Sequence, residues 1–202
     1  MKEIQYDEVL HIKTAGEQKG FNQSIHYHRY EPTPYFALEQ LFQHLTIQST
    51  DRIVDFGCGK GRLNFFIHEL FNASVVGIEM NEFFYLEALE NKKSYISKKK
   101  KSAEKIHFLC CLAEEYTINP FDNIFYFFNP FSIQIFMKII RNILLSVEQN
   151  PRVIKIVLYY ASDEYMFYLE NQTIFELVEE VRLTGLYEKN PNERFLVYQL
   201  SY

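Results

Sequence analysis

The sequence predicts an α/β fold: a doubly wound, mostly parallel sheet of seven strands with an antiparallel hairpin at its C-terminal end. From residue 53 onward, short β-rich runs alternate with amphipathic helical patterns, which is typical of a parallel sheet covered by helices. One strand-like run leads directly into a glycine-rich turn and a helix. The last two apolar runs are joined by a short loop rich in Asn and Pro, which predicts the hairpin.

The elements follow from these patterns in chain order. The fourth run, "NIFYFF", is apolar throughout, which suits a central strand covered on both faces. Parallel strands are predicted at 52–56, 74–79, 105–110, 123–128 and 152–160, and the hairpin strands at 175–183 and 194–200. Helices are predicted after the glycine turn, from about residue 82, and after the fourth strand, where apolar residues recur at helical spacing.

The part before the sheet is predicted to be an arm or lid, residues 1–33, on a single domain that spans 1–202. No repeat or linker divides the chain, and 202 residues with 48% hydrophobic content suffice for one core. A helix is expected next, with Thr33 as its N-cap and Pro34 at its first position, where a missing N–H costs nothing.

Composition limits the classes of partner. No apolar run reaches the roughly 18 residues of a spanning helix, and the start is acidic, so we expect a cytoplasmic protein without a membrane partner. The net charge of −5 argues against a broadly basic surface. The run "SKKKKSAEK" at 97–105 is the one candidate for a local nucleic-acid patch, but a solvated helix end explains it better. Three cysteines predict neither a disulfide framework nor a cysteine-based zinc site, and we expect no metal.

The stretch "DFGCGKGR" is the most informative of the chain. Gly57, Gly59 and Gly61 lie between a strand and a helix, where glycine allows a sharp turn and close contact between backbone and ligand. In open α/β sheets ligands bind at this carboxyl end of the strands. A dinucleotide fingerprint would need glycine at position 62, which is Arg62, so a nicotinamide-dependent oxidoreductase is a weak alternative.

The pattern present is acid-x-G-x-G-x-G with Asp55 at its head, and it resembles motif I of the class I S-adenosylmethionine-dependent methyltransferases. "YEPTPY", "DFGCGKGR" and "NPF" together are similar to segments of bacterial members of this family. The resemblance implies a Rossmann-like methyltransferase fold and the cofactor S-adenosyl-L-methionine. It implies that the cofactor contacts Asp55, Gly57, Cys58, Gly59 and Gly61.

An acid ends the second predicted strand. Glu79 follows the last glycine of the turn by 18 residues, near the spacing at which an acid binds ribose hydroxyls. The family has such an acid here, so the resemblance implies this role for Glu79. Alone, Glu79 would be interpreted as a surface carboxylate at a strand end.

Two further cofactor contacts are implied less directly. The family often has an Asp after the third strand that meets the adenine; the alignment places Leu112 there, followed by Ala113. Glu114, or backbone and apolar contacts, would have to replace that Asp. In the arm, Tyr30 and Tyr35 are expected to line the methionine end, because aromatic rings suit a cation.

The run "FFNPF" ends the fourth predicted strand. Amino-methyltransferases of the family have Asn or Asp, two prolines and an aromatic residue here, and oxygens of this motif accept hydrogen bonds from the target nitrogen. Asn129, Pro130 and Phe131 resemble that motif with one proline missing, and they are the predicted catalytic residues. The expected function is methylation of a nitrogen on a protein or small molecule, with RNA possible as acceptor.

Two alternatives to that interpretation stay open. An ordinary turn would also place Asn and Pro after a strand. A module that binds S-adenosylmethionine but has lost catalysis would explain both Leu112 and the shortened motif. Histidines in the arm, His26 and His28, are weak candidates for a base.

Overall fold

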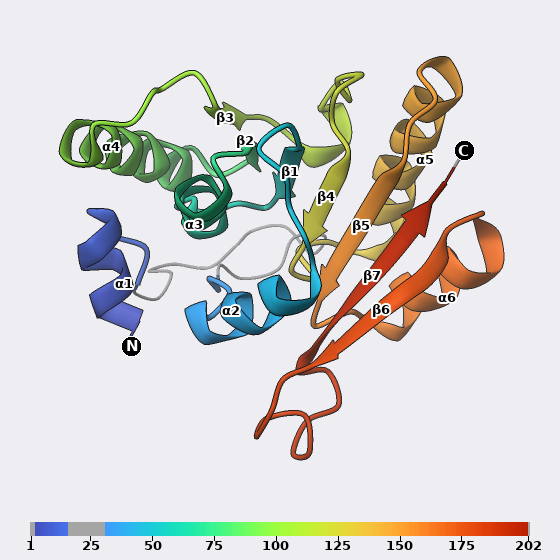
Figure 1. Ribbon diagram of the computed structural model, residues 1–202. Coiled ribbons are helices and arrows are strands. Elements are labelled where there is room, and N and C mark those ends of the chain that lie inside the picture. The colour runs from blue at the N-terminus through green and yellow to red at the C-terminus, as the bar shows by residue number, and fades with distance from the viewer. Residues whose placement is uncertain (1–2, 16–30, 202) are drawn as a thin grey trace.

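The computed structural model describes residues 3–15 and 31–201. Seven strands of this described part form one sheet in the order β3-β2-β1-β4-β5-β7-β6 (Figure 1). Strands β1 to β5 run parallel, and β7 pairs antiparallel with both β5 and β6. The strands are β1 Arg52–Phe56, β2 Ser74–Glu79, β3 Ile106–Cys110, β4 Ile124–Phe127, β5 Ile154–Tyr159, β6 Glu176–Arg182 and β7 Arg194–Leu200. The predicted fold class is confirmed, with strand ends within two residues of those expected.

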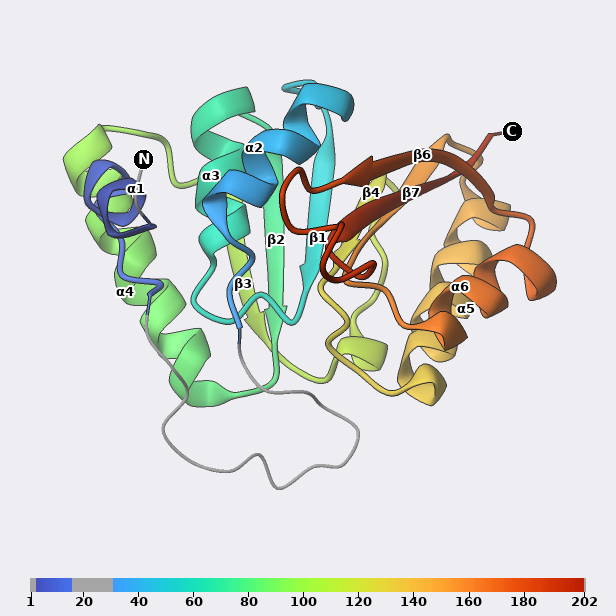
Figure 2. The ribbon, with the colours of Figure 1, turned by 90° about the horizontal axis from the view of Figure 1, so that it is seen from below.

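Helices cover both faces of the sheet (Figures 1 and 2). One face carries α1 Glu3–Leu10, α2 Tyr35–His44, α3 Arg62–Phe71 and α4 Glu82–Lys99, and the other carries α5 Ile133–Gln149 and α6 Asp163–Gln172 with the short 3₁₀ helix η1 Ala113–Glu115. Two of the α-helices, α1 and α6, were not predicted, and neither was η1. The eight residues of α1 bury only Asp7 and Leu10, so no apolar period marks the helix in the sequence.

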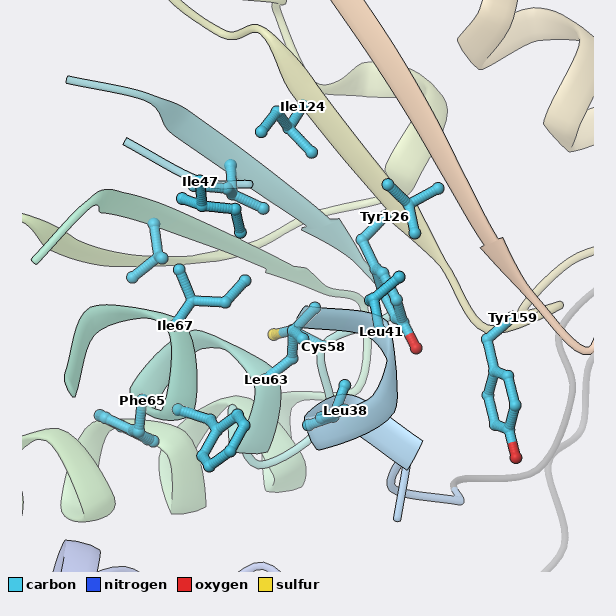
Figure 3. Close-up of a cluster of buried hydrophobic side chains, with 14 of the residues drawn as sticks. Leu38, Leu41, Ile47, Cys58, Leu63, Phe65, Ile67, Ile124, Tyr126 and Tyr159 are labelled. Atoms are coloured by element: carbon cyan, nitrogen blue, oxygen red, sulfur yellow. The ribbon is translucent and has the colours of Figure 1, made fainter. Parts of the chain in front are cut away.

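Each face has its own hydrophobic core, and strand alternation divides the residues between them. On β4, Ile124 and Tyr126 belong to the core beneath α2 and α3, which Figure 3 shows together with Leu38 and Leu63. Phe125 on the same strand points to the opposite core, beneath α5 and α6. This double burial explains why the fourth strand is apolar at every position.

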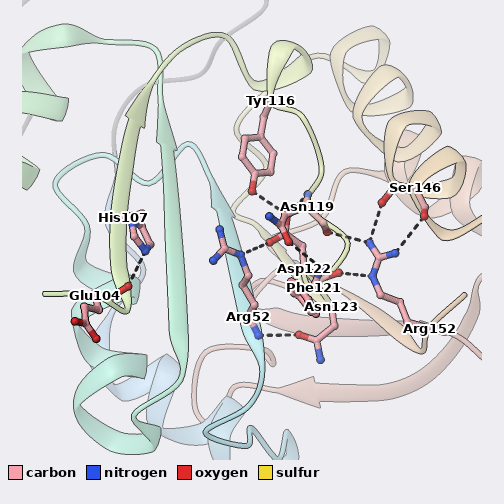
Figure 4. Close-up of polar contacts among 10 residues, drawn as sticks. All are labelled: Arg52, Glu104, His107, Tyr116, Asn119, Phe121, Asp122, Asn123, Ser146 and Arg152. Atoms are coloured by element: carbon pink, nitrogen blue, oxygen red, sulfur yellow. Dashed lines mark hydrogen bonds and ion pairs between the residues drawn. The ribbon is translucent and has the colours of Figure 1, made fainter. Parts of the chain in front are cut away.

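A polar network joins the amino ends of three strands (Figure 4). The buried carboxylate of Asp122 accepts hydrogen bonds from Arg52 Nε at 2.7 Å and from the Tyr116 hydroxyl at 2.8 Å. Arg152 Nε donates to the Asp122 carbonyl at 2.8 Å. Arg52 begins β1, Asp122 precedes β4 and Arg152 precedes β5. The network therefore fixes the amino edge of the sheet, which is opposite to the carboxyl ends of the strands.

The lysine run also lies at this amino edge. Helix α4 starts at the carboxyl end of β2 and ends at Lys99, whose ammonium pairs with Glu69 at 2.7 Å. Lys105 Nζ donates to the carbonyl of Asn72, just beyond the end of α3, at 2.7 Å. The run therefore joins the ends of two helices, in agreement with its interpretation as a helix end and loop.

Candidate functional site

The glycine turn lies at the carboxyl edge of β1. Gly57, Gly59 and Gly61 all have positive φ angles, of 81°, 54° and 85°. A Cβ on Gly57 would lie 2.9 Å from Pro130 Cβ, and one on Gly61 would lie 2.6 Å from Phe108 Cζ. Backbone conformation and space therefore both select glycine at the first and last of these positions. The turn therefore lies against Phe108 of β3 at Gly61 and against Pro130 of the "NPF" segment at Gly57.

Glu79 ends β2 next to this turn and is only 9% exposed. Its Oε2 accepts a hydrogen bond from the Gly59 N–H at 2.9 Å, and its Oε1 accepts one from the Asn81 N–H at 2.8 Å. Burial raises the pKa of Glu79, and the backbone donors partly offset that effect. The carboxylate is thus fixed between the glycine turn and the start of α4.

Asp55 lies inside β1, in register with Gly77 of β2 and Tyr126 of β4. Burial, and then the charge of Glu79, raise the pKa of Asp55 to about 8. Burial and the charges of the same two carboxylates raise the pKa of the Cys58 thiol well above its usual value. The Cys58 thiol is therefore protonated near neutral pH. A nearby cation would favour the charged form of Asp55.

A small cavity opens between the turn and the ends of β2 and β3. Its volume is about 20 Å³, and it is lined by Gly57, Ile78, Glu79, Met80, Cys111, Ala113 and Phe131. Four of these were predicted site residues: Gly57, Glu79, Ala113 and Phe131. Two of the others, Met80 and Cys111, are neighbours in the sequence of the predicted residues Glu79 and Leu112.

Other predicted residues lie apart from this cavity. Leu112 is 39% exposed and precedes η1, and it does not line the cavity. Tyr35 is 0% exposed, and its ring stacks on Tyr6 with centroids 4.6 Å apart. Tyr30, His26 and His28 lie outside the described residues. The roles predicted for all five of these residues stay predictions.

The "NPF" segment follows β4 at the same edge. Asn129 has a positive φ of 39°, which asparagine tolerates better than most residues. Pro130 packs on Gly57, and the Phe131 carbonyl accepts a hydrogen bond from the Tyr165 hydroxyl of α6 at 2.7 Å. The half-buried ring of Phe128 packs on the ring of Tyr159, with the ring centroids 4.6 Å apart. The segment is therefore held by the glycine turn on one side and by α6 on the other.

These residues fit S-adenosylmethionine in their chemistry. Carboxylates accept hydrogen bonds from ribose hydroxyls. The negative charges of Asp55 and Glu79 interact, so a cation nearby would be stabilised. Ala113 and Phe131 provide apolar walls. Pockets for ligands of this size are about 300–1,000 Å³, far larger than this cavity of about 20 Å³. Within 3–15 and 31–201, no group of His, Cys, Asp and Glu is arranged to hold a metal ion.

The described helices also bear on the membrane prediction. None of those within 3–15 and 31–201 is both long and apolar enough to cross a lipid bilayer.

Solved structures share the fold. An RNA methyltransferase from Salinibacter ruber in complex with S-adenosyl-L-homocysteine has a TM-score of 0.59 and 21% identity, covering 84% of this chain and 92% of that one. A tRNA (uracil-54, C5)-methyltransferase from Pyrococcus abyssi, also in complex with S-adenosyl-L-homocysteine, has a TM-score of 0.54 and 18% identity, covering 85% of this chain and 40% of that one. The human methyltransferase 10 domain containing protein has a TM-score of 0.56 and 13% identity, covering 83% and 80%.

The family comparison covers most of the chain. No curated protein matches the sequence. The family model described as "Methyltransferase domain" matches residues 47–185, which include every strand of the parallel sheet and the whole glycine turn. The match agrees with the motif that Asp55 begins and leaves no support for the oxidoreductase alternative. This chain therefore belongs to the methyltransferase domain family, the class I S-adenosylmethionine-dependent enzymes that its glycine turn resembles.

Proposed function

We propose that the protein methylates a nitrogen atom of a protein or small-molecule acceptor, which Asn129 holds against the cofactor. The observation that carries this proposal is the contact between the "NPF" segment and the glycine turn. Pro130 packs directly on Gly57, so Asn129 lies one residue from the backbone that faces the cofactor. An ordinary turn elsewhere on the sheet would not have this contact.

The cofactor would be held from three sides of the carboxyl edge. Asp55, Gly57, Cys58, Gly59 and Gly61 of the turn form one side, Glu79 binds the ribose hydroxyls, and Leu112 with Ala113 lies beside the adenine. When bound, S-adenosylmethionine supplies a methyl group on a sulfonium, which a nucleophile displaces in line.

Asn129 positions the acceptor and does not remove its proton. An amine attacks through its lone pair, so it must be neutral, and an amide oxygen that accepts its N–H aims that lone pair. Phe131 would form a wall of the same site, since it already lines the cavity. Because a carboxamide is not a base, the proton that the product loses goes to water.

Within the described residues, the distribution of cations supports an acceptor without phosphates. Beside the glycine turn, Lys60 is paired with Glu87 at 3.2 Å and Arg62 is paired with Glu3. The lysine run lies at the opposite edge of the sheet. Phosphate contacts supply much of the affinity in nucleic-acid binding, and they need cations near the site. RNA is the second candidate acceptor, because four of the similar structures are described as RNA or tRNA methyltransferases or putative ones.

A transfer assay with labelled S-adenosylmethionine tests the proposal. The protein would be incubated with a cell extract separated into protein, RNA and small-molecule fractions, and Asn129→Ala would be compared with Asn171→Ala, which changes an exposed residue of α6. Label in protein or small molecules that only Asn129→Ala abolishes supports the proposal.

Three other results would contradict the proposal. Label in RNA alone would establish the second candidate. Cofactor binding without any transferred label would establish an inactive binding module. Equal transfer by Asn129→Ala and the unchanged enzyme would remove the role of Asn129.

A further inference from the structure

Arg62 links the glycine turn to the N-terminal segment, defined here as residues 3–15. It follows Gly61 directly, and it is only 5% exposed although it carries a guanidinium group. Its Nε donates to Thr14 Oγ1 at 2.7 Å, and its Nη1 pairs with the carboxylate of Glu3. The same Nη1 donates to the Thr33 carbonyl at 3.2 Å. One side chain thus binds both described stretches that precede the sheet.

Asn91 of α4 makes a second link, on the other side of Gly61. Its Nδ2 donates to the Lys60 carbonyl in the glycine turn at 3.1 Å and to the Lys13 carbonyl at 3.2 Å. Its Oδ1 accepts from the Lys13 N–H at 2.8 Å. A single buried amide therefore contacts the backbone of the turn and the backbone of the N-terminal segment.

Asp7 fixes the segment itself behind these links. Its buried carboxylate accepts from the Thr14 N–H at 2.6 Å, from the Thr14 hydroxyl at 2.7 Å and from the Ala15 N–H at 3.0 Å. The Tyr35 hydroxyl donates to the same carboxylate at 2.7 Å, and the Arg62 guanidinium lies 4.5 Å from the centre of the Tyr35 ring. Thr14 therefore has one defined position, from which it holds Arg62.

The Thr33 hydroxyl adds a contact to the sheet. The prediction that it caps the next helix is wrong: α2 begins at Tyr35 with Pro34 in the N-cap position and no side-chain cap. Instead, the Thr33 hydroxyl lies 2.7 Å from the hydroxyl of Tyr126, the residue of β4 in register with Asp55. The residues before α2 thus contact the strand that carries the "NPF" segment.

Burying a polar network of this kind costs desolvation free energy, which apolar packing would not cost. In return, the network holds its members in one defined arrangement. The glycine turn needs such support. Three of its five residues are glycines, which have no side chains of their own to fix the backbone. The network holds the residues on both sides of Gly61, the Lys60 carbonyl through Asn91 and the Arg62 side chain through Thr14.

We propose that the N-terminal segment is a working part of the cofactor site, with Arg62 and Asn91 as positioning residues that couple it to the glycine turn. This rests on the proposed function, since the turn must hold S-adenosylmethionine for the coupling to matter. Coupling between two sites is reciprocal. The segment strengthens cofactor binding, and bound cofactor in turn stabilises the segment.

Calorimetry with S-adenosylhomocysteine tests one direction of the coupling. Thr14→Val keeps the shape of the side chain and removes the hydroxyl that holds Arg62, and Asn91→Leu removes the amide at similar shape. Each is expected to weaken binding about tenfold, within the usual range of coupling between sites. The matched control, Thr117→Val, changes an exposed threonine and is expected to bind as the unchanged protein does.

Hydrogen exchange tests the other direction on the unchanged protein, so it decides the matter even where a variant fails to fold. The amides of Thr14 and Ala15, which donate to Asp7, are expected to exchange more slowly when the cofactor product is bound. A merely structural network would lower the melting temperature of both variants without changing affinity or this protection.

The outcomes separate the two proposals. Unchanged protein that binds no cofactor product overturns the proposed function. Normal binding by the unchanged protein, with equal affinity in Thr14→Val and Asn91→Leu and no slower exchange at Thr14 and Ala15, overturns the coupling alone.

Discussion

Pro130 lies against Gly57 so closely that a Cβ on the glycine would come within 2.9 Å of the proline Cβ. The two residues are 73 positions apart in the sequence, one in the turn after β1 and the other in the segment after β4. Their contact joins the part of the site that would hold the cofactor to the part that would hold the acceptor. It is the reason why a change at either residue is expected to affect both.

Gly57→Ala is expected to reduce both stability and cofactor affinity. The φ angle of 81° alone costs a non-glycine residue about 1–2 kcal/mol, and the overlap with Pro130 adds to that cost by displacing the "NPF" segment. Thermal unfolding and calorimetry with S-adenosylhomocysteine measure the two effects.

Gly185→Ala is the matched control for that variant. Gly185 has nearly the same φ, 82°, but a Cβ there would meet no atom within 4 Å. This variant should lose the stability that the positive φ angle costs and should bind S-adenosylhomocysteine as tightly as the unchanged protein does. Equal behaviour of the two variants would mean that the contact with Pro130 has no consequence.

Asp55→Asn is expected to change how stability depends on pH. The pKa of Asp55 is raised from its ordinary value of 3.8 to about 8, so its contribution to stability is complete at low pH and is lost as pH rises through about 8. The asparagine variant does not ionise, so its free energy of unfolding should fall less over this range. Urea unfolding of both proteins at several pH values measures the difference, and parallel curves would contradict the raised pKa.

Asn64→Leu is expected to stabilise the protein. Asn64 of α3 is 0% exposed, and neither atom of its amide has a hydrogen-bond partner within the described part of the chain. Replacing it by the similarly shaped leucine removes an unsatisfied polar group, with an expected gain of about 1 kcal/mol. A higher melting temperature supports this, with the exposed Asn171→Leu as control. A lower one would show that the amide is satisfied after all.

Asp122→Ala is expected to destabilise the protein without affecting the site. The carboxylate is fully buried, and its loss leaves the Arg52 guanidinium without its partner, at a cost of about 3–5 kcal/mol. Since this network lies at the amino edge of the sheet, cofactor affinity measured well below the melting temperature should stay the same. A weakened affinity would indicate that the two edges are coupled.

The sheet could be predicted from the sequence because its signals are local. A central parallel strand such as β4 is apolar at every position, and the turns between elements need glycine or proline at fixed positions. Both hairpin strands lie within one residue of their predicted bounds. The turn at Gly57 and the acid at Glu79 were recognisable for the same reason. The order of the strands in the sheet, β3-β2-β1-β4-β5-β7-β6, was not predicted.

The rest depends on partners that are distant in the sequence. Helix α1 has no apolar period because Asp7, one of its two buried residues, is a polar centre for Thr14 and Tyr35. Asn91 looks like any polar residue of a helix until Lys13 and Lys60 are seen beside it. Thr33 carries the signature of an N-cap, but its partner on β4 is 93 residues away.

Strand β7 has a consequence for how the chain reaches its native state. Residues 194–200 pair with β5 on one side and β6 on the other, so the strand that comes last in the sequence lies inside the sheet. A nascent chain that has not yet released these residues from the ribosome has an open edge along β5, next to β4, the strand that the "NPF" segment follows. At about 5–20 residues per second, synthesis leaves that edge open for seconds, and this interval is when a chaperone would be needed most.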